Sequence, residues 1–182
     1  GIFYPFWKAI FKKADRIQAI SNYLADFARR HGAKCPIEVI PNGVDLTRFQ
    51  TEGIRRPRRC VYISSPDRGL HWVLAMWPEI RFAYPDAELH IYYEVQKWLD
   101  NAQLINNEIG VRASYCVQKL NHLQKHGVVL RGAIPPRLLA EELTQADLLL
   151  YPCDTVSYTE GMSCSILESC AAGVVPIITD AD

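Results

Sequence analysis

Short apolar runs alternate with stretches of helical periodicity along most of the chain. The first unit consists of an expected strand over residues 16–20, a helix over residues 22–32 that begins after Ser21, and a strand over residues 37–40. Turn residues at 41–43 then end the second strand. This order predicts one βαβ unit.

The alternation stops at residues 50–59, where charge, glycine and proline replace the periodic apolar positions. Such a composition is typical of a linker between domains. We therefore expect residues 1–49 to be the end of one domain and residues 60–182 to form a second one. In the second, the expected strands cover residues 60–64, 88–93, 128–134, 147–152 and 174–179, and the expected helices cover residues 70–84, 96–126, 136–146 and 165–173.

Strands that alternate with helices pair in parallel, because each helix carries the chain back to the edge of the sheet where the strands begin. Several of the expected strands are nearly continuous apolar runs, which is typical of strands covered by helices on both faces. The sequence therefore predicts an α/β protein with a doubly wound, Rossmann-like parallel sheet.

Composition narrows the class of protein. The 20 basic and 20 acidic residues balance, so no long-range field favours nucleic acid as a partner. The 6 cysteines form neither a CxxC pair nor a zinc-ligand spacing, which favours reduced thiols. The sequence has no run of about 18 apolar residues and no signal-peptide pattern, so we expect a cytoplasmic protein.

The N-terminal segment mixes apolar and basic side chains, as helices in a membrane interface do. The apolar ones are Phe3, Tyr4, Phe6, Trp7, Ile10 and Phe11, and the bases are Lys8, Lys12 and Lys13. A helix packed on another part of the protein is the favoured interpretation. Peripheral contact with the inner face of a membrane is the alternative.

Ligands of doubly wound proteins bind beyond the carboxyl ends of the strands, so the loops that follow the strands are candidate sites. The longest such loop ends with Gly161, Met162 and Ser163, at the start of the helix expected over residues 165–173. Helix N-termini bind phosphate through their unpaired N–H groups, and glycine lets the backbone approach a ligand closely. This loop is therefore a candidate phosphate site.

Two carboxylates, Glu160 and Glu168, bracket that turn. Carboxylates in these positions can hold hydroxyl groups at opposite ends of a phosphosugar lying along the start of the helix. The alternative is structural: Ser165 and Glu168 fit the S-x-x-E capping box, in which the glutamate serves only its own helix. The local sequence does not choose between the two.

The loop after the first strand of the second domain carries another candidate group: Ser64, Ser65, Arg68 and Gly69. A guanidinium there can reach a diphosphate that is bound against a neighbouring helix terminus. Taken by itself, the loop also fits a Ser-Pro-Asp turn with a solvated arginine.

Other chemistries have weaker signals. Neither a G-x-G-x-x-G fingerprint nor a Walker A loop is present, which argues against a nicotinamide dinucleotide site and a P-loop. His122 and His126 have the spacing of a metal-binding pair on a helix but no third ligand nearby, so a solvated helix face is favoured. Cys164 is expected to pack as a small residue rather than to act as a nucleophile.

In order and spacing, five segments resemble the group 1 (family four) retaining glycosyltransferases of the GT-B fold. They are ADRIQAISNYLADFARRHG, IEVIPNGVDLTRF, SSPDRGL, PDAELHIYY and TEGMSCSILESCAAGVVPIIT. Residues Glu160 to Glu168 are similar to the E-x7-E motif of that family. The resemblance covers nearly the whole chain from Ala14.

The resemblance implies a hexosyltransferase with a nucleotide-sugar donor site, most simply for a UDP- or GDP-sugar, and a glycan, lipid or other acceptor. Glu168 would accept hydrogen bonds from the ribose, and Glu160 would hold hexose hydroxyls. The amides of residues 161–163, with Ser64, Ser65 and Gly69 close by, would meet the donor. Arg68 would neutralise the departing diphosphate. Family members retain the anomeric configuration and generally need no metal or other cofactor.

The sequence departs from the family pattern at three places. Met162 and Ser163 stand where the family often has Phe-Gly, and a basic residue expected near Ile63 and Ser64 is missing. Relative to a two-domain GT-B enzyme, the chain is expected to be truncated: it has only the last βαβ portion of the acceptor domain, and its donor domain lacks the closing C-terminal helices. We therefore expect weak donor binding and little or no transfer from this chain alone.

Two other functions remain open. A noncatalytic nucleotide-sugar-binding or interaction module would keep the same fold, and its nucleotide affinity would not depend on Glu168. A nucleotide-sugar epimerase on a related fold would isomerise the donor without an acceptor.

Overall fold

The computed structural model describes residues 4–50, 53–104, 107–153 and 162–180. The chain forms two compact units: residues 1–43 with 160–164, and residues 44–159 with 165–182. The linker expected at residues 50–59 and the domain boundaries drawn from it stay predictions.

The first unit is the predicted βαβ unit with one further helix. Its elements are α1 (Tyr4–Lys13), β1 (Ile17–Ala19), α2 (Asn22–Arg30) and β2 (Ile37–Val39). Strands β1 and β2 pair in parallel, and the Ser21 side chain accepts a hydrogen bond from the Leu24 amide at 3.2 Å, which caps α2 as predicted. The Phe11 ring lies edge-on to Phe27, 6.3 Å between centroids, so α1 packs on α2. This contact supports the favoured interpretation of the N-terminal segment.

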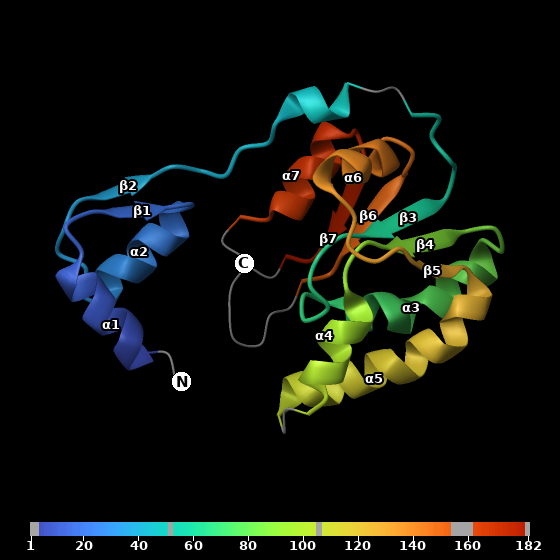
Figure 1. The fold of residues 1–182 in the computed structure, drawn as a ribbon, viewed down its shortest axis with the longest axis horizontal. Helices are drawn as coiled ribbons and strands as arrows, with labels where there is room; N and C mark the ends of the chain where they lie inside the picture. Colours follow the sequence, from blue (N-terminus) through green and yellow to red (C-terminus); the bar gives the residue numbers. More distant parts are fainter. Residues whose placement is uncertain (1–3, 51–52, 105–106, 154–161, 181–182) are drawn as a thin grey trace. The chain divides into compact units, whose positions relative to one another are not determined.

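The second unit is a five-stranded sheet with helices on both faces (Figure 1). The strands pair in parallel in the order β5-β4-β3-β6-β7. Its elements are η1 (Leu46–Phe49), β3 (Arg59–Tyr62), α3 (Leu70–Ala83), β4 (Glu88–Ile91), α4 (Val95–Ala102), α5 (Glu108–Leu123), η2 (Gln124–His126), β5 (Val128–Leu130), α6 (Pro136–Leu143), β6 (Leu148–Tyr151), α7 (Cys164–Ala171) and β7 (Val175–Ile178). The predicted doubly wound α/β fold is confirmed.

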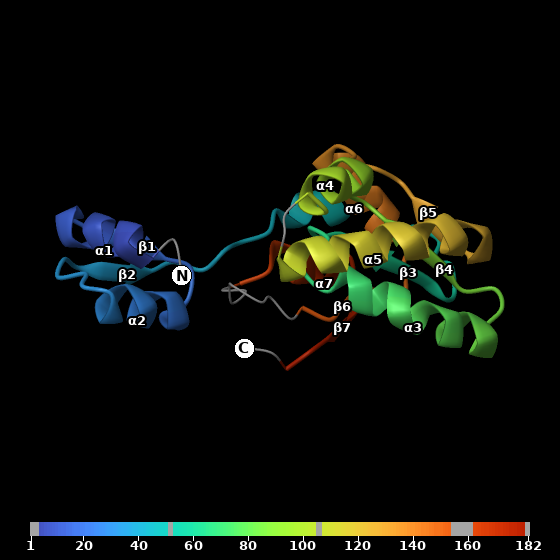
Figure 2. The same cartoon turned by 90° about the horizontal axis from the view of Figure 1, so that it is seen from below.

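Each face of the sheet has its own apolar core, because successive strand residues point to opposite faces. Tyr62 of β3 packs in the cluster formed with α3, α4 and α5, whereas Val61 packs in the cluster formed with α6 and Ala172. Figure 1 shows α3 and α5 on one side of the sheet and α6 and α7 on the other, and Figure 2 shows α3 and α5 side by side.

Three expected elements differ in the structure: the helix over residues 96–126, the strand over residues 128–134 and the strand over residues 174–179. Residues 96–126 form α4, α5 and η2 rather than one helix, because the Asn107 side chain accepts hydrogen bonds from the amides of Ile109 and Gly110 and starts a new helix. Strand β5 is shorter than expected: it ends before Gly132, whose φ of 70° leaves the β region.

Strand β7 differs in its burial. It was expected to be covered on both faces, but Val175, Ile177 and Ile178 are exposed, and β7 is the last strand in the sheet order.

All 6 cysteines are free, as predicted. In the described part of the chain, no helix is both long and apolar enough to span a membrane.

Candidate functional site

The strand order creates a topological switch point between β3 and β6. From β3 the chain adds β4 and β5 on one side of the sheet, and then β6 and β7 on the other. The loops that follow β3 and β6 therefore start from neighbouring strands at the carboxyl edge of the sheet, where folds of this kind bind ligands. Both loops carry predicted site residues.

The loop after β3 is held by the buried tyrosine at the end of that strand. The Tyr62 hydroxyl donates to the Ser65 carbonyl at 2.6 Å. Burial raises the pKa of Tyr62 well above its usual value, so the hydroxyl keeps the proton that it donates. Ser64 and Ser65 are half-buried beyond this anchor. The loop thus has a fixed starting point at the carboxyl edge of the sheet.

Gly69 brings the same loop against the end of β6. Its φ is 89°, and a Cβ atom at this position would lie 1.9 Å from the Pro152 carbonyl oxygen. No side chain fits in that space, and the backbone conformation is one that only glycine adopts without strain. Gly69 is therefore required by the packing of two loops, whatever further contact it makes with a ligand.

Arg68, one residue earlier, spans the switch point. Its Nη1 lies 3.4 Å from the hydroxyl of Tyr151, the last residue of β6. The side chain is half-buried, and this contact places the guanidinium at the carboxyl end of β6. A fully solvated turn arginine would not make this contact.

The start of α7 is tied to the same edge. The Ser165 hydroxyl donates to the carbonyl of Ile63, the residue after β3, at 3.1 Å. Ser163 is buried. Within the first unit, the carbonyl of the half-buried Met162 accepts a hydrogen bond from Asn42 Nδ2 at 3.1 Å. Glu160 and Gly161 lie outside the described residues. The first turn of α7 and the loop after β3 thus meet at the switch point.

Glu168, in the second half of α7, does not form the capping box. Its carboxylate oxygen Oε1 accepts a hydrogen bond from Arg48 Nη2 at 2.7 Å, and the two side chains are only 25% and 23% exposed, Arg48 first. Ser165 donates to Ile63 instead of capping its own helix. The structural alternative for Glu168 is therefore wrong, while its predicted role toward a ribose stays a prediction.

Arg48 was missed in the sequence. It lies on η1, which Asp45 caps by accepting from the Thr47 amide at 3.0 Å, and the neighbouring Phe49 is partly buried in the core. An N-cap aspartate followed by an apolar anchor is a recognisable signal for an ordered turn. No local pattern indicates that the arginine reaches a helix 120 residues away.

A separate polar cluster lies between the sheet and α6. The Tyr92 hydroxyl donates to Glu142 Oε2 at 2.8 Å, and Arg59 Nη1 lies 3.5 Å from the same oxygen. His90 lies nearby and is buried; burial lowers its pKa, and the charge of Arg59 adds to this effect. These contacts join β3, β4 and α6 and do not involve the predicted site residues.

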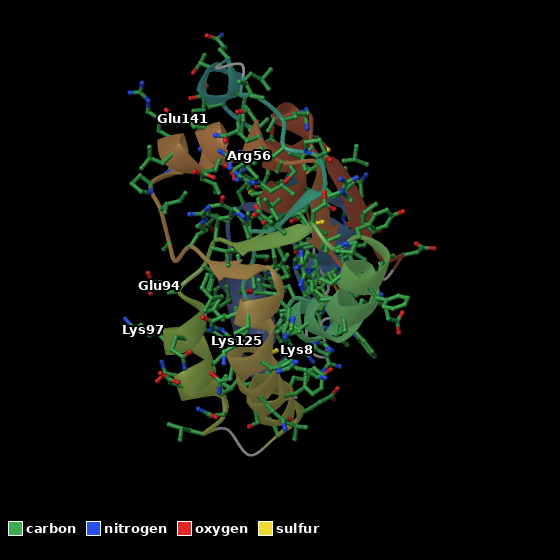
Figure 3. The ribbon with its side chains drawn as sticks, turned by 90° about the vertical axis from the view of Figure 1, so that its right-hand side faces the viewer. Lys8, Arg56, Glu94, Lys97, Lys125 and Glu141 are labelled. Atoms are coloured by element: carbon green, nitrogen blue, oxygen red, sulfur yellow. The ribbon has the colours of Figure 1, made fainter. Side chains whose placement is uncertain are left out.

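Figure 3 shows the exposed side chains of Glu94 and of Lys97 in α4 projecting outward from the second unit.

The remaining candidates do not form a site. His122 and His126 are both exposed, with 4.8 Å between ring centroids, and no group of three or more metal-binding side chains occurs among the described residues. The exposed helix face expected for them is confirmed. Cys164 is exposed at the start of α7, so its expected packing role is wrong.

Comparisons with known proteins show the family of the chain. Residues 1–48 match the family described as Glycosyltransferase Family 4, and residues 57–182 match Glycosyl transferases group 1. The chain is 28% identical to a GDP-mannose-dependent alpha-(1-6)-phosphatidylinositol monomannoside mannosyltransferase of Mycolicibacterium smegmatis, over 91% of this chain and 44% of that protein.

Solved structures share the fold. The pneumococcal O-GlcNAc transferase GtfA in complex with UDP and GlcNAc superimposes with a TM-score of 0.71 at 16% identity, over 100% of this chain and 33% of that one. Anabaena HepE in complex with UDP and glucose gives 0.72 at 14% identity, over 98% of this chain and 48% of that one. The chain spans less than half the length of each of these relatives. Because the group 1 match alone covers more than half of the sequence, the chain belongs to the group 1 glycosyl transferases.

Proposed function

We propose that the second unit carries the nucleotide-sugar donor site of a hexosyltransferase. The donor is a nucleoside diphosphate hexose with UDP or GDP as the nucleotide. The diphosphate lies beside Arg68 and the first turn of α7, the ribose hydroxyls bond to Glu168, and Glu160 holds the hexose. Ser64, Ser65, Gly69, Gly161, Met162 and Ser163 line the donor.

One observation carries this proposal. Arg68 contacts Tyr151 across the switch point, and Ser165 bonds to Ile63, so the loop after β3, the end of β6 and the start of α7 meet at one edge. A guanidinium and a helix N-terminus at the same sheet edge provide positive potential for a diphosphate, and they stabilise the leaving group more as it develops charge. A simple capping arrangement does not call for this combination, and the G-x-G-x-x-G fingerprint of a dinucleotide site is absent from the sequence.

The rest of the reaction follows the family resemblance. We propose transfer to a glycan or lipid acceptor with retention of the anomeric configuration, and with the arginine and the helix terminus in place of a metal ion. The proposed location is the cytoplasm, with peripheral membrane contact through α1 as a further possibility to test. The chain by itself is expected to bind the donor weakly and to transfer it poorly, because it covers only 44% of the length of the mannosyltransferase that it matches.

Calorimetric titration tests the donor site. UDP, GDP, ADP and their glucose or mannose conjugates are titrated into the chain and into Glu168→Ala. We expect saturable binding of one base, weakened more than tenfold, or about 1.4 kcal/mol, in the variant, because a charged acceptor of two hydroxyl groups is lost.

The other outcomes identify the competing functions. Equal nucleotide affinity in both proteins indicates an interaction module that keeps the fold without using Glu168. Isomerisation of the bound sugar in the absence of an acceptor indicates an epimerase. The absence of binding to either protein contradicts a donor site in this chain.

A further inference from the structure

The pairing of Arg48 with Glu168 bears on how a nucleotide would be held. The two residues are 120 positions apart in sequence, and both belong to the second unit. The pair has good hydrogen-bond length, 2.7 Å, and is mostly shielded from water, so its attraction is stronger than that of an exposed surface pair. The contact therefore restrains the glutamate side chain.

Arg48 is itself held by short-range structure. Asp45 accepts hydrogen bonds from the amide and the hydroxyl of Thr47, which fixes η1, and Phe49 anchors the turn in the core next to α6. The guanidinium carbon of Arg48 lies 5.5 Å from the centroid of the Phe49 ring. Because Arg48 is held in place in this way, it can set the orientation of the Glu168 side chain.

The geometry of the pair leaves half of the carboxylate available. In a bidentate pair, two nitrogens of arginine would engage both oxygens of Glu168. Here only Nη2 is engaged, and the buried Nε of Arg48 has no hydrogen-bond partner among the described residues. Oε1 of Glu168 is taken, and no described residue donates to Oε2. A carboxylate held by one oxygen presents the other as an oriented acceptor.

We propose that Arg48 is a positioning residue for the donor nucleotide: it holds Oε1 of Glu168 so that Oε2 accepts a hydrogen bond from the ribose. This inference rests on the proposed donor site. It adds a requirement that the E-x7-E pattern does not contain, namely a cation from the segment that precedes the donor domain's first strand. Without Arg48, the carboxylate turns freely and loses its preference for the ribose.

Discrimination between ribose and dideoxyribose tests the proposal. UDP and GDP, each with its 2′,3′-dideoxy analogue, are titrated into the wild-type chain and into Arg48→Met, Arg48→Gln, Arg48→Lys and Glu168→Gln. We expect wild type to favour the ribose form by about tenfold or more. The two neutral Arg48 variants and Glu168→Gln should bring this ratio close to one, and Arg48→Lys should restore most of it.

Arg112→Met is the matched control. Arg112 pairs with Glu108 at 2.6 Å within α5, so its removal breaks an arginine–glutamate pair that lies within one helix. We expect this variant to keep the wild-type ratio. A general loss of packing lowers affinity for both nucleotide forms together, whereas the loss of a positioned acceptor lowers only the affinity for the ribose form.

The outcomes separate the two claims. Thermal unfolding followed by circular dichroism establishes which variants are folded, and either neutral Arg48 variant that folds decides the question. A wild-type ratio in that variant, together with a lost ratio in Glu168→Gln, overturns the role of Arg48 and leaves the donor site standing. A wild-type chain that binds no nucleotide, or binds both forms equally, overturns the donor site and this inference with it.

Discussion

Gly69→Ala is expected to destabilise the second unit by roughly 3–5 kcal/mol, although it adds only one methyl group. The new Cβ would lie 1.9 Å from the Pro152 carbonyl oxygen, and the backbone would be held at a φ of 89°. Neither problem is relieved without moving the loop after β3 away from the end of β6. In thermal unfolding, the melting temperature should fall by about 10–20 °C.

Gly132→Ala separates strain from collision. Gly132 also has a positive φ, 70°, but the nearest atom to an added Cβ is Glu94 Oε1 at 3.7 Å, an ordinary contact. We expect a loss of about 1 kcal/mol from the backbone conformation alone. Equal losses in the two variants would show that the approach of Gly69 to Pro152 is not what fixes the loop.

Arg68→Met should weaken nucleoside diphosphate binding by about 10- to 100-fold, the value expected when a charge-assisted hydrogen bond to a phosphate is removed. The proposed contact is with the diphosphate, so the affinity of the unphosphorylated nucleoside should hardly change. Methionine keeps most of the side-chain volume beside Tyr151, which limits any change in packing. Titration of UDP and uridine, or GDP and guanosine, measures the two affinities.

Arg68→Lys serves as the conservative control, because it keeps the charge but loses the fork geometry of the guanidinium. Its diphosphate affinity should fall between those of wild type and Arg68→Met. If the methionine variant loses nucleoside and nucleoside diphosphate affinity equally, Arg68 shapes the loop and does not bind phosphate.

Much of this fold could be predicted because its signals are local. The apolar runs of β3 and β6 and the Ser21 cap of α2 lie within a few residues of the elements that they define. The helix break at Asn107 was missed because, in a polar stretch, a capping asparagine looks like any other surface residue. The assignment of Glu160 and Glu168 to the E-x7-E pattern rests on the resemblance to the family and not on local physics.

The candidate site was less predictable, because tertiary contacts decide it. The Ser165 and Glu168 spacing allowed a capping box, and only the folded chain shows that these residues contact Ile63 and Arg48 instead. The need for glycine at position 69 depends likewise on Pro152, which is remote in sequence. Patterns of residue type predicted which loops carry the candidate site residues, but the partners of each side chain come from strands and turns elsewhere in the chain.

A crystal structure of this chain with a bound nucleoside diphosphate is the most direct test of the donor site. We predict that the diphosphate lies at the carboxyl edge between β3 and β6 and contacts the Arg68 guanidinium. The ribose should bond to Oε2 of Glu168 while Arg48 stays on Oε1. A nucleotide bound away from this edge, with Arg68 and Glu168 not in contact with it, would contradict the account.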